Sequence, residues 1–186
     1  VRSATPGLAV DLHNCQPFMD GNLSFVHNGF IENFRQTLYR PIRDSLCDRT
    51  YNTIHGLTDS EHIFALLLHH LYRQQQGSLA AAVQQTLMVL EALAHQYQVR
   101  VAANLAVSDG QQLVACRYDS TGAAPSLYWL QNAPQFPQSV LLASEPLFAA
   151  EWVSCPADTV ITVEPDGRLH TQPYRSLNPV STSPSA

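Results

Sequence analysis

Three short segments carry side chains that could act together on a small polar molecule. The first, Arg2-Ser3-Ala4-Thr5, places a guanidinium among small residues, where its planar fork could hold a carboxylate. The second, His27-Asn28-Gly29, offers a side-chain amide and a backbone N–H, the donors that an oxyanion hole requires. The third, residues 56–61, places Asp59 where a helix would begin and its dipole favours a carboxylate. Each also has an ordinary explanation: a surface arginine, a tight turn and a helix cap.

Hydrophobic periodicity predicts the elements that would carry the second segment. Apolar and polar residues alternate over 23–26, which predicts a strand that runs into a sharp turn at Asn28-Gly29. Apolar side chains at positions i, i+3 and i+7 then predict a short helix over 31–38, which should end before Pro41. The oxyanion donors would therefore lie in a turn between a strand and a helix.

A longer helical block would carry the third segment. Thr58 and Glu61 have the spacing of a capping box, so a helix should begin at Asp59 and end near Gly77. Ser78 should cap a second helix, whose apolar residues recur at three- and four-residue steps. The short link between these helices predicts that they lie antiparallel.

Strand character returns after the helices. Runs over 99–107 and 113–118 flank Asp109-Gly110, which is a strong hairpin signal. Further strands are predicted at 127–130, 140–143, 159–164 and 168–174, the last two joined by a turn at Asp166-Gly167. This order predicts one α+β domain over residues 1–177, with helices on the sheet faces. The polar tail 178–186 is predicted to be disordered.

The composition excludes several classes of function. All ten residues counted as Lys or Arg are Arg, which excludes a Schiff-base lysine, a pyridoxal-phosphate enzyme and a Walker-A loop. The formal net charge of −5 argues against nucleic-acid binding, because phosphate contacts require a basic face. The sequence has no apolar run of membrane-spanning length and no signal-peptide pattern. We therefore expect a cytoplasmic protein that uses no cofactor and binds no membrane.

Histidine and cysteine positions do not predict a metal site. His62, His69 and His70 fall on the first long helix without a carboxylate or cysteine at ligand spacing, and we interpret them as a solvated or interface set. The four cysteines show no CxxC spacing, so we expect reduced and mostly buried thiols.

In this order the three segments resemble class II glutamine amidotransferases, members of the N-terminal-nucleophile hydrolase superfamily. Other segments resemble the stand-alone branch that includes the ergothioneine-pathway γ-glutamyl hydrolase. These are Asn14-Cys15-Gln16-Pro17-Phe18, Asn104-Leu105 followed by Asp109-Gly110, Arg117-Tyr118, and Ala143-Ser144-Glu145-Pro146-Leu147. The resemblance implies a four-layer αββα sandwich, here incomplete at the N-terminus, that cleaves a γ-glutamyl amide through a cysteine thioester.

The resemblance also implies a role for each site residue. Arg2 would hold the α-carboxylate of the γ-glutamyl group, and Asp59 would hold its α-ammonium. Asn28 and the N–H of Gly29 would stabilise the oxyanion formed at the γ-carbonyl. His27 belongs to the implied substrate-binding set, and we expect it to support the local turn rather than to transfer a proton.

The nucleophile of the resembled family is a cysteine at the mature N-terminus, whereas this sequence begins at Val1. Cys15 lies in the Asn-x-Gln-Pro-Phe segment, and Cys47, Cys116 and Cys155 lie outside every motif, so we expect none of them to replace it. We therefore interpret the sequence as a fragment that lacks its nucleophile and is inactive by itself.

Two alternatives remain open, and both concern what the chain does with its substrate. It could be a non-catalytic γ-glutamyl-binding or regulatory module, or the ammonia-supplying subunit of a two-component amidotransferase. The expected partners are a small γ-glutamyl substrate and either a second copy of the chain or a separate acceptor subunit.

Overall fold

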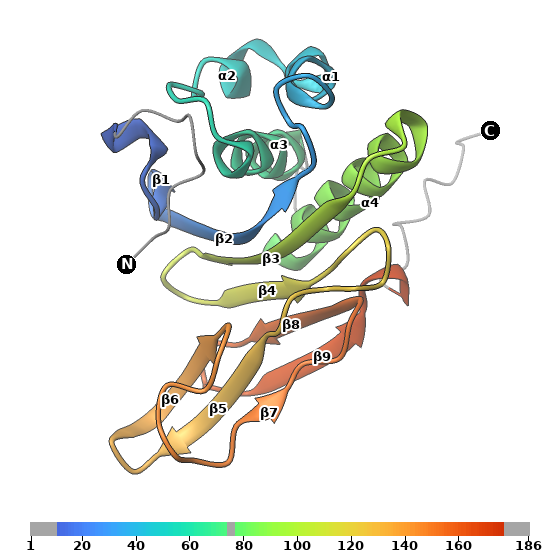
Figure 1. Ribbon diagram of the computed structural model, residues 1–186. Coiled ribbons are helices and arrows are strands. Elements are labelled where there is room, and N and C mark those ends of the chain that lie inside the picture. The colour runs from blue at the N-terminus through green and yellow to red at the C-terminus, as the bar shows by residue number, and fades with distance from the viewer. Residues whose placement is uncertain (1–10, 74–76, 177–186) are drawn as a thin grey trace, which may run out of the picture.

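Two antiparallel sheets are stacked face to face, and helices cover the outer face of the larger sheet (Figure 1). The computed structural model describes residues 11–73 and 77–176. The larger sheet has the order β1-β2-β3-β4-β8-β9 and contains β1 (Phe18–Asp20), β2 (Leu23–Ile31), β3 (Val101–Ser108), β4 (Leu113–Arg117), β8 (Thr159–Val163) and β9 (Leu169–Pro173). The smaller sheet has the order β6-β5-β7 and contains β5 (Tyr128–Ala133), β6 (Phe136–Ala143) and β7 (Val153–Ser154).

The helices gather on one side of the larger sheet. The two long helices are α3 (Asp59–Arg73), which packs on β2, and α4 (Leu79–Tyr97), which packs on β3, β4 and β8. The short helices α1 (Tyr39–Ser45) and α2 (Asp48–Tyr51) pack against α3 (Figure 1). Single 3-10 turns form η1 (Leu12–Asn14) and η2 (Tyr174–Ser176). The described residues thus show one helical layer and two sheets of the expected sandwich.

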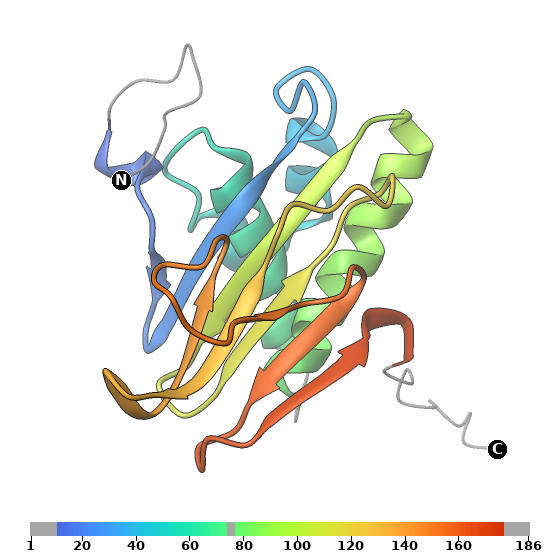
Figure 2. The same ribbon diagram turned by 60° about the horizontal axis from the view of Figure 1, so that its bottom comes forward.

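Alternate residues of the central strands point into two separate apolar cores. Val114 and Val160 belong to the core under α3 and α4. Ala115 and Ile161, the next residues along the same strands, belong to the core between the two sheets. Figure 2 shows β5 and β6 in front of β3 and β4, on the face away from α4. The near-continuous apolar runs of β4 and β8 follow from this coverage of both faces.

The predicted starts of both long helices are confirmed. Thr58 Oγ1 accepts a hydrogen bond from the N–H of Glu61 at 3.1 Å, in the first turn of α3. The Glu61 carboxylate does not complete the reciprocal capping box, because it accepts from the backbone N–H groups of His55 and Gly56 at 2.7 Å each. Ser78 caps α4 as predicted.

Two predictions around the second segment are wrong. β2 continues through Asn28-Gly29 without a turn, because β3 pairs with it residue by residue over 24–31. Residues 32–38 form turns rather than a helix, and α1 contains Pro41 in its first turn. Proline is tolerated there because the first N–H groups of a helix have no acceptor within the helix.

The other strand predictions agree with the structure. β3 and β4 pair across Asp109-Gly110, where Gly110 has a φ of +85°. β5, β6, β8 and β9 lie where strands were predicted, whereas β1 and β7 were missed because they are too short to show periodicity. The tail 178–186, the domain end at residue 177 and the link 74–76 lie outside the described residues.

Candidate active site

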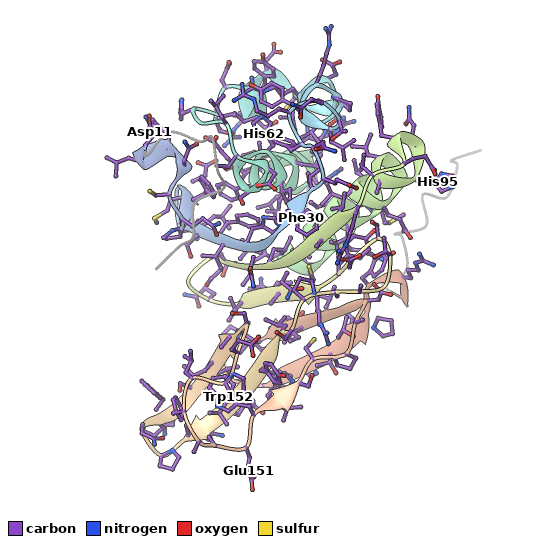
Figure 3. All side chains as sticks on the ribbon, viewed as in Figure 1. Asp11, Phe30, His62, His95, Glu151 and Trp152 are labelled. Atoms are coloured by element: carbon purple, nitrogen blue, oxygen red, sulfur yellow. The ribbon has the colours of Figure 1, made fainter. Side chains whose placement is uncertain are left out.

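His27, Asn28, Gly29 and Asp59 line one cavity of about 1080 Å³. The cavity lies between β2, the beginning of α3 and residues 142–144 at the end of β6. Phe30, labelled in Figure 3, lies on the same stretch of β2 below the helices. The second and third sequence segments therefore meet, whereas Arg2 lies outside the described residues.

The backbone of β2 presents an edge to this cavity. The N–H of His27 donates to Gln16 Oε1 at 2.6 Å, and Gln16 Nε2 donates to the His27 carbonyl at 2.9 Å. Further along the strand, the N–H of Ile31 donates to Asp59 Oδ2 at 3.0 Å. Because alternate N–H groups of a strand point to the same side, the N–H of Gly29 also points to this edge. Gly29 thus offers a backbone donor between the Gln16 amide and the Asp59 carboxylate.

Gly29 also makes room for the ring of His27. A Cβ at Gly29 would lie 2.0 Å from the carbonyl oxygen of Ala102 and 2.6 Å from His27 Nε2. The buried ring bridges two elements: Nε2 lies 3.2 Å from the Ala102 oxygen, and Nδ1 lies 2.9 Å from Ser60 Oγ. Because a carbonyl only accepts, we assign the proton to Nε2. The ring is engaged within the fold, and a direct contact of His27 with substrate stays a prediction.

The Asp59 carboxylate is held at the junction of β2 and α3. Besides the bond that Ile31 donates to Oδ2, Asp59 Oδ1 accepts from the backbone N–H of Ser60 at 2.7 Å. Ser60 Oγ lies 3.3 Å from the same oxygen, and with the His27 proton on Nε2 its hydroxyl donates to His27 Nδ1. Each carboxylate oxygen can accept more than one hydrogen bond, so these contacts fix the orientation of the group and leave it able to bind a cation. Asp59 is only partly buried and lines the cavity.

Three residues that line the cavity had no role assigned from sequence. Gln16 bonds to the backbone of His27 at the edge of β2, Ser60 links α3 to His27, and Asn104 lies opposite Asn28 in the β2–β3 ladder. Gln16 and Asn104 both fall in segments that resembled the stand-alone branch, and that resemblance was the available signal. Their roles depend on pairing between distant segments, which periodicity does not reveal.

The histidines of α3 are not the solvated or interface set that the sequence suggested. His62 is fully buried, donates from Nδ1 to the Thr58 carbonyl at 2.7 Å and accepts from Arg43 Nε at 2.9 Å. Burial and the Arg43 charge lower the pKa of His62 to about 4. His69 is also buried, and its Nδ1 accepts from the N–H of Cys47 at 3.0 Å. Over 11–73 and 77–176, no group of three histidine, cysteine or acidic side chains is placed to hold a metal ion.

The four cysteines are free, and they differ in their surroundings. Burial raises the pKa of Cys116 to about 12 and that of Cys155 to about 11, which disfavours the thiolate at both positions. Cys47 is exposed, and hydrogen bonds with Thr50 lower its pKa, but it does not line the cavity. Cys15 is exposed and does line it. The expectation of mostly buried thiols therefore holds for two of the four.

The family model of glutamine amidotransferases class-II matches residues 1–147. The chain belongs to this family. The probable glutamine amidotransferase DUG3 of Saccharomyces cerevisiae is 30% identical over 200 residues, with 88% of this chain and 56% of that protein covered. The chain thus spans about half the length of this curated relative. No helix in the described part of this amidotransferase chain is long and apolar enough to cross a membrane.

Solved structures agree with this membership. A glutamine aminotransferase class-II domain protein from Silicibacter pomeroyi has a TM-score of 0.72 and 26% identity, covering 86% of this chain and 71% of that chain. The glutamine phosphoribosylpyrophosphate amidotransferase of B. subtilis has a TM-score of 0.59 and 16% identity, covering 91% of this chain and 34% of that chain. The latter likeness shows the fold alone, and that fold is the α+β architecture of the N-terminal-nucleophile hydrolases.

Proposed function

We propose that the cavity binds the glutamyl group of a γ-glutamyl amide and stabilises the oxyanion formed at its γ-carbonyl. The observation that carries the proposal is the edge of β2, where the Gly29 N–H lies between Gln16 and the Asp59 carboxylate. The Asn28 side chain lies on the wall of the same cavity. A carboxylate near two oxyanion donors suits a substrate whose ammonium group is several bonds from the reacting carbonyl. Arg2 would hold the α-carboxylate.

The proposed reaction runs through a glutamyl thioester. A thiolate attacks the γ-carbonyl carbon, the C–N bond breaks, and the amine leaves with a proton. Water then attacks the thioester, which releases glutamate and restores the thiol. Asn28 Nδ2 and the Gly29 N–H would contact the same oxygen in both tetrahedral stages, where one such donor contributes about 3 kcal/mol.

We propose that the attacking thiol is none of the four cysteines. Cys116 and Cys155 are buried with raised pKa values, and Cys47 is outside the cavity. Cys15 is the competing candidate because it lines the cavity. Cys15→Ser therefore discriminates: it should leave turnover within about twofold, and complete loss of turnover would assign the reaction to Cys15.

The decisive test compares two substrates that differ in the α-amino group. The protein with its complete natural coding sequence, including any residues encoded before Val1, is assayed with a γ-glutamyl anilide and with the corresponding glutaryl anilide. The wild type should prefer the γ-glutamyl compound in kcat/KM, and Asp59→Asn should reduce that preference about 10- to 100-fold, because it removes a charge-assisted hydrogen bond to the ammonium.

The matched control is Asp48→Asn, because Asp48 is likewise the first residue of a helix and does not line the cavity. It should leave the substrate preference unchanged. Damage to the fold by Asp59→Asn would lower kcat/KM equally for both substrates and leave the ratio of the two kcat/KM values unchanged. A wild type that cleaves neither compound, but binds L-glutamate more tightly than glutarate in calorimetry, would favour the binding-module alternative.

The remaining functional assignments also belong to this proposal. We propose that residues 1–177 form one amidotransferase domain, since β8 and β9 extend the same sheet as β1–β4. We also propose that the released amine leaves the site as product or passes to a separate acceptor subunit. Size-exclusion chromatography of the complete protein, alone and after co-purification, tests whether it associates with a second copy of itself or with a separate acceptor subunit.

A further inference from the structure

Asn104 and Asn28 lie directly opposite each other in the β2–β3 ladder. Residues that oppose each other in an antiparallel pair project from the same face of the sheet, with Cβ atoms about 5 Å apart. Asn28 is exposed and Asn104 is 4% exposed, and both line the cavity. Two carboxamides therefore lie within hydrogen-bonding reach of each other at the proposed oxyanion site.

The orientation of the Asn104 amide is fixed by its surroundings. Its Nδ2 donates to the carbonyl oxygens of Pro125 and Ser126 at 3.0 and 2.9 Å. Because carbonyl oxygens only accept, these bonds identify the nitrogen and hold it toward segment 125–126. The Asn104 Oδ1 atom is buried and has no hydrogen-bond partner among residues 11–73 and 77–176. A buried acceptor without a partner is costly, and it requires an explanation.

A side-chain amide stabilises an oxyanion only when its nitrogen faces the oxyanion. The Asn28 carboxamide is exposed to the cavity, where either its nitrogen or its oxygen could face the substrate. With the oxygen inward, the group would repel an oxyanion instead of stabilising it. Asn104 Oδ1 cannot donate, so it favours the orientation that brings Asn28 Nδ2 toward it.

We propose that Asn104 is a positioning residue for Asn28. Its Oδ1 accepts one Nδ2–H of Asn28 when ligand is bound, which leaves the second Nδ2–H for the oxyanion. The β2–β3 register places the two asparagines opposite each other, which supports the proposed hydrogen bond, whereas its consequence for catalysis rests on the proposed function.

A double-mutant cycle tests the catalytic consequence in the complete protein with a γ-glutamyl anilide. Asn104→Ala should lower kcat about 10- to 100-fold with little change in KM, because a misoriented donor loses much of its stabilising effect. In the Asn28→Ala background the same change should lower kcat less than about threefold. If the two losses multiply, Asn104 does not act through Asn28.

The control is Arg117→Met, which loosens the same segment from another side. Arg117 Nε donates to the Pro125 carbonyl at 2.7 Å, and Arg117 Nη2 donates to the Ala124 carbonyl at 3.0 Å. If Asn104 served only to anchor this segment, Arg117→Met would reproduce the loss of kcat. We expect it to lower thermal stability and to leave kcat within about threefold of the wild type.

Side-chain amide NMR tests the contact without activity. The Asn28 signal is identified by its disappearance in Asn28→Ala, and spectra are recorded with and without saturating L-glutamate. With glutamate, one Asn28 amide proton should show the small temperature coefficient of a hydrogen-bonded proton, and Asn104→Ala should abolish this property. A large coefficient for both protons in the wild type overturns the proposal, even if Asn104→Ala does not fold.

The double-mutant cycle and the NMR experiment together separate this inference from the proposed function. A wild type that shows the Asn28–Asn104 contact but no γ-glutamyl turnover sinks the proposed function and retains the contact. A wild type that turns over γ-glutamyl anilide while the losses multiply sinks the inference and retains the proposed function.

Discussion

At the scale of single residues, the site depends on which atoms are already satisfied. The His27 and Ile31 N–H groups donate to side chains, whereas the Gly29 N–H between them faces the cavity. The missing side chain of Gly29 has a second consequence, because the space it leaves is filled by the ring of His27 and the carbonyl of Ala102. Gly29 is therefore required by packing as well as by the proposed chemistry.

Gly29→Ala should destabilise the protein by about 3 kcal/mol or more, because the new Cβ would lie 2.0 Å from a backbone oxygen and the strands must separate. Urea unfolding measures this loss. The control is Gly110→Ala, where a Cβ meets no atom of the described residues within 4 Å but φ is +85°, so only about 1 kcal/mol of backbone strain is expected. Equal losses at both positions would contradict the packing role of Gly29.

At the scale of elements, side chains bond to backbone groups along one edge of β2 in the described part of the chain. The Gln16 amide bonds to both backbone groups of His27, as a neighbouring strand would. Asp59 does the same for the N–H of Ile31 and ties α3 to β2. His27 and Ser60 add a second link between these two elements. The proposed oxyanion site and the proposed ammonium site are thus kept in register by contacts outside the regular ladder.

Gln16→Leu should remove this surrogate pairing. The N–H of His27 would lose its acceptor, so its hydrogen exchange should accelerate markedly, and the free energy of unfolding should fall by about 1 to 2 kcal/mol. Gln36→Leu is the matched control, because Gln36 is exposed and lines the same cavity. An unchanged exchange rate at His27 in Gln16→Leu would show that the pairing does not persist in solution.

At the scale of the whole molecule, the helical layer is joined partly through buried polar groups. His62 of α3 accepts a hydrogen bond from Arg43 of α1. Its ring makes an edge-to-face contact with Phe34, with ring centroids 4.9 Å apart. Arg43 in turn lies over the Tyr39 ring, 4.7 Å from its centroid. A buried neutral histidine at this junction couples the packing of the helices to pH.

Stability should therefore decline as the pH falls from about 7 toward 4. The folded pKa of His62 is about 4, below its ordinary value of 6.5, so the unfolded chain takes up the proton first and is favoured. His62 alone should contribute a loss of about 3 kcal/mol over this range, with a further loss of the same sign from His70, whose pKa is also about 4.

Urea unfolding between pH 4 and pH 7.5 measures this dependence. His62→Gln should flatten the profile, whereas His95→Gln should leave it unchanged, because His95 is an exposed residue of α4 far from His62 in Figure 3. A wild-type profile as flat as that of His62→Gln would refute the assignment.

The sequence by itself determined the family, the α+β class, both long helices and the main strands. Caps, turns and periodicity are local signals, and Asp59, Ser78 and Asp109-Gly110 carried them. Only the tertiary structure decided that β2 runs straight through Asn28-Gly29, because pairing with β3 overrides the local turn preference. The same holds for Gln16, Ser60 and Asn104, which meet the site through contacts between distant segments. Strand register and the hydrogen bonding of a strand's edge depend on which distant segments pair, and a local sequence pattern does not contain this information.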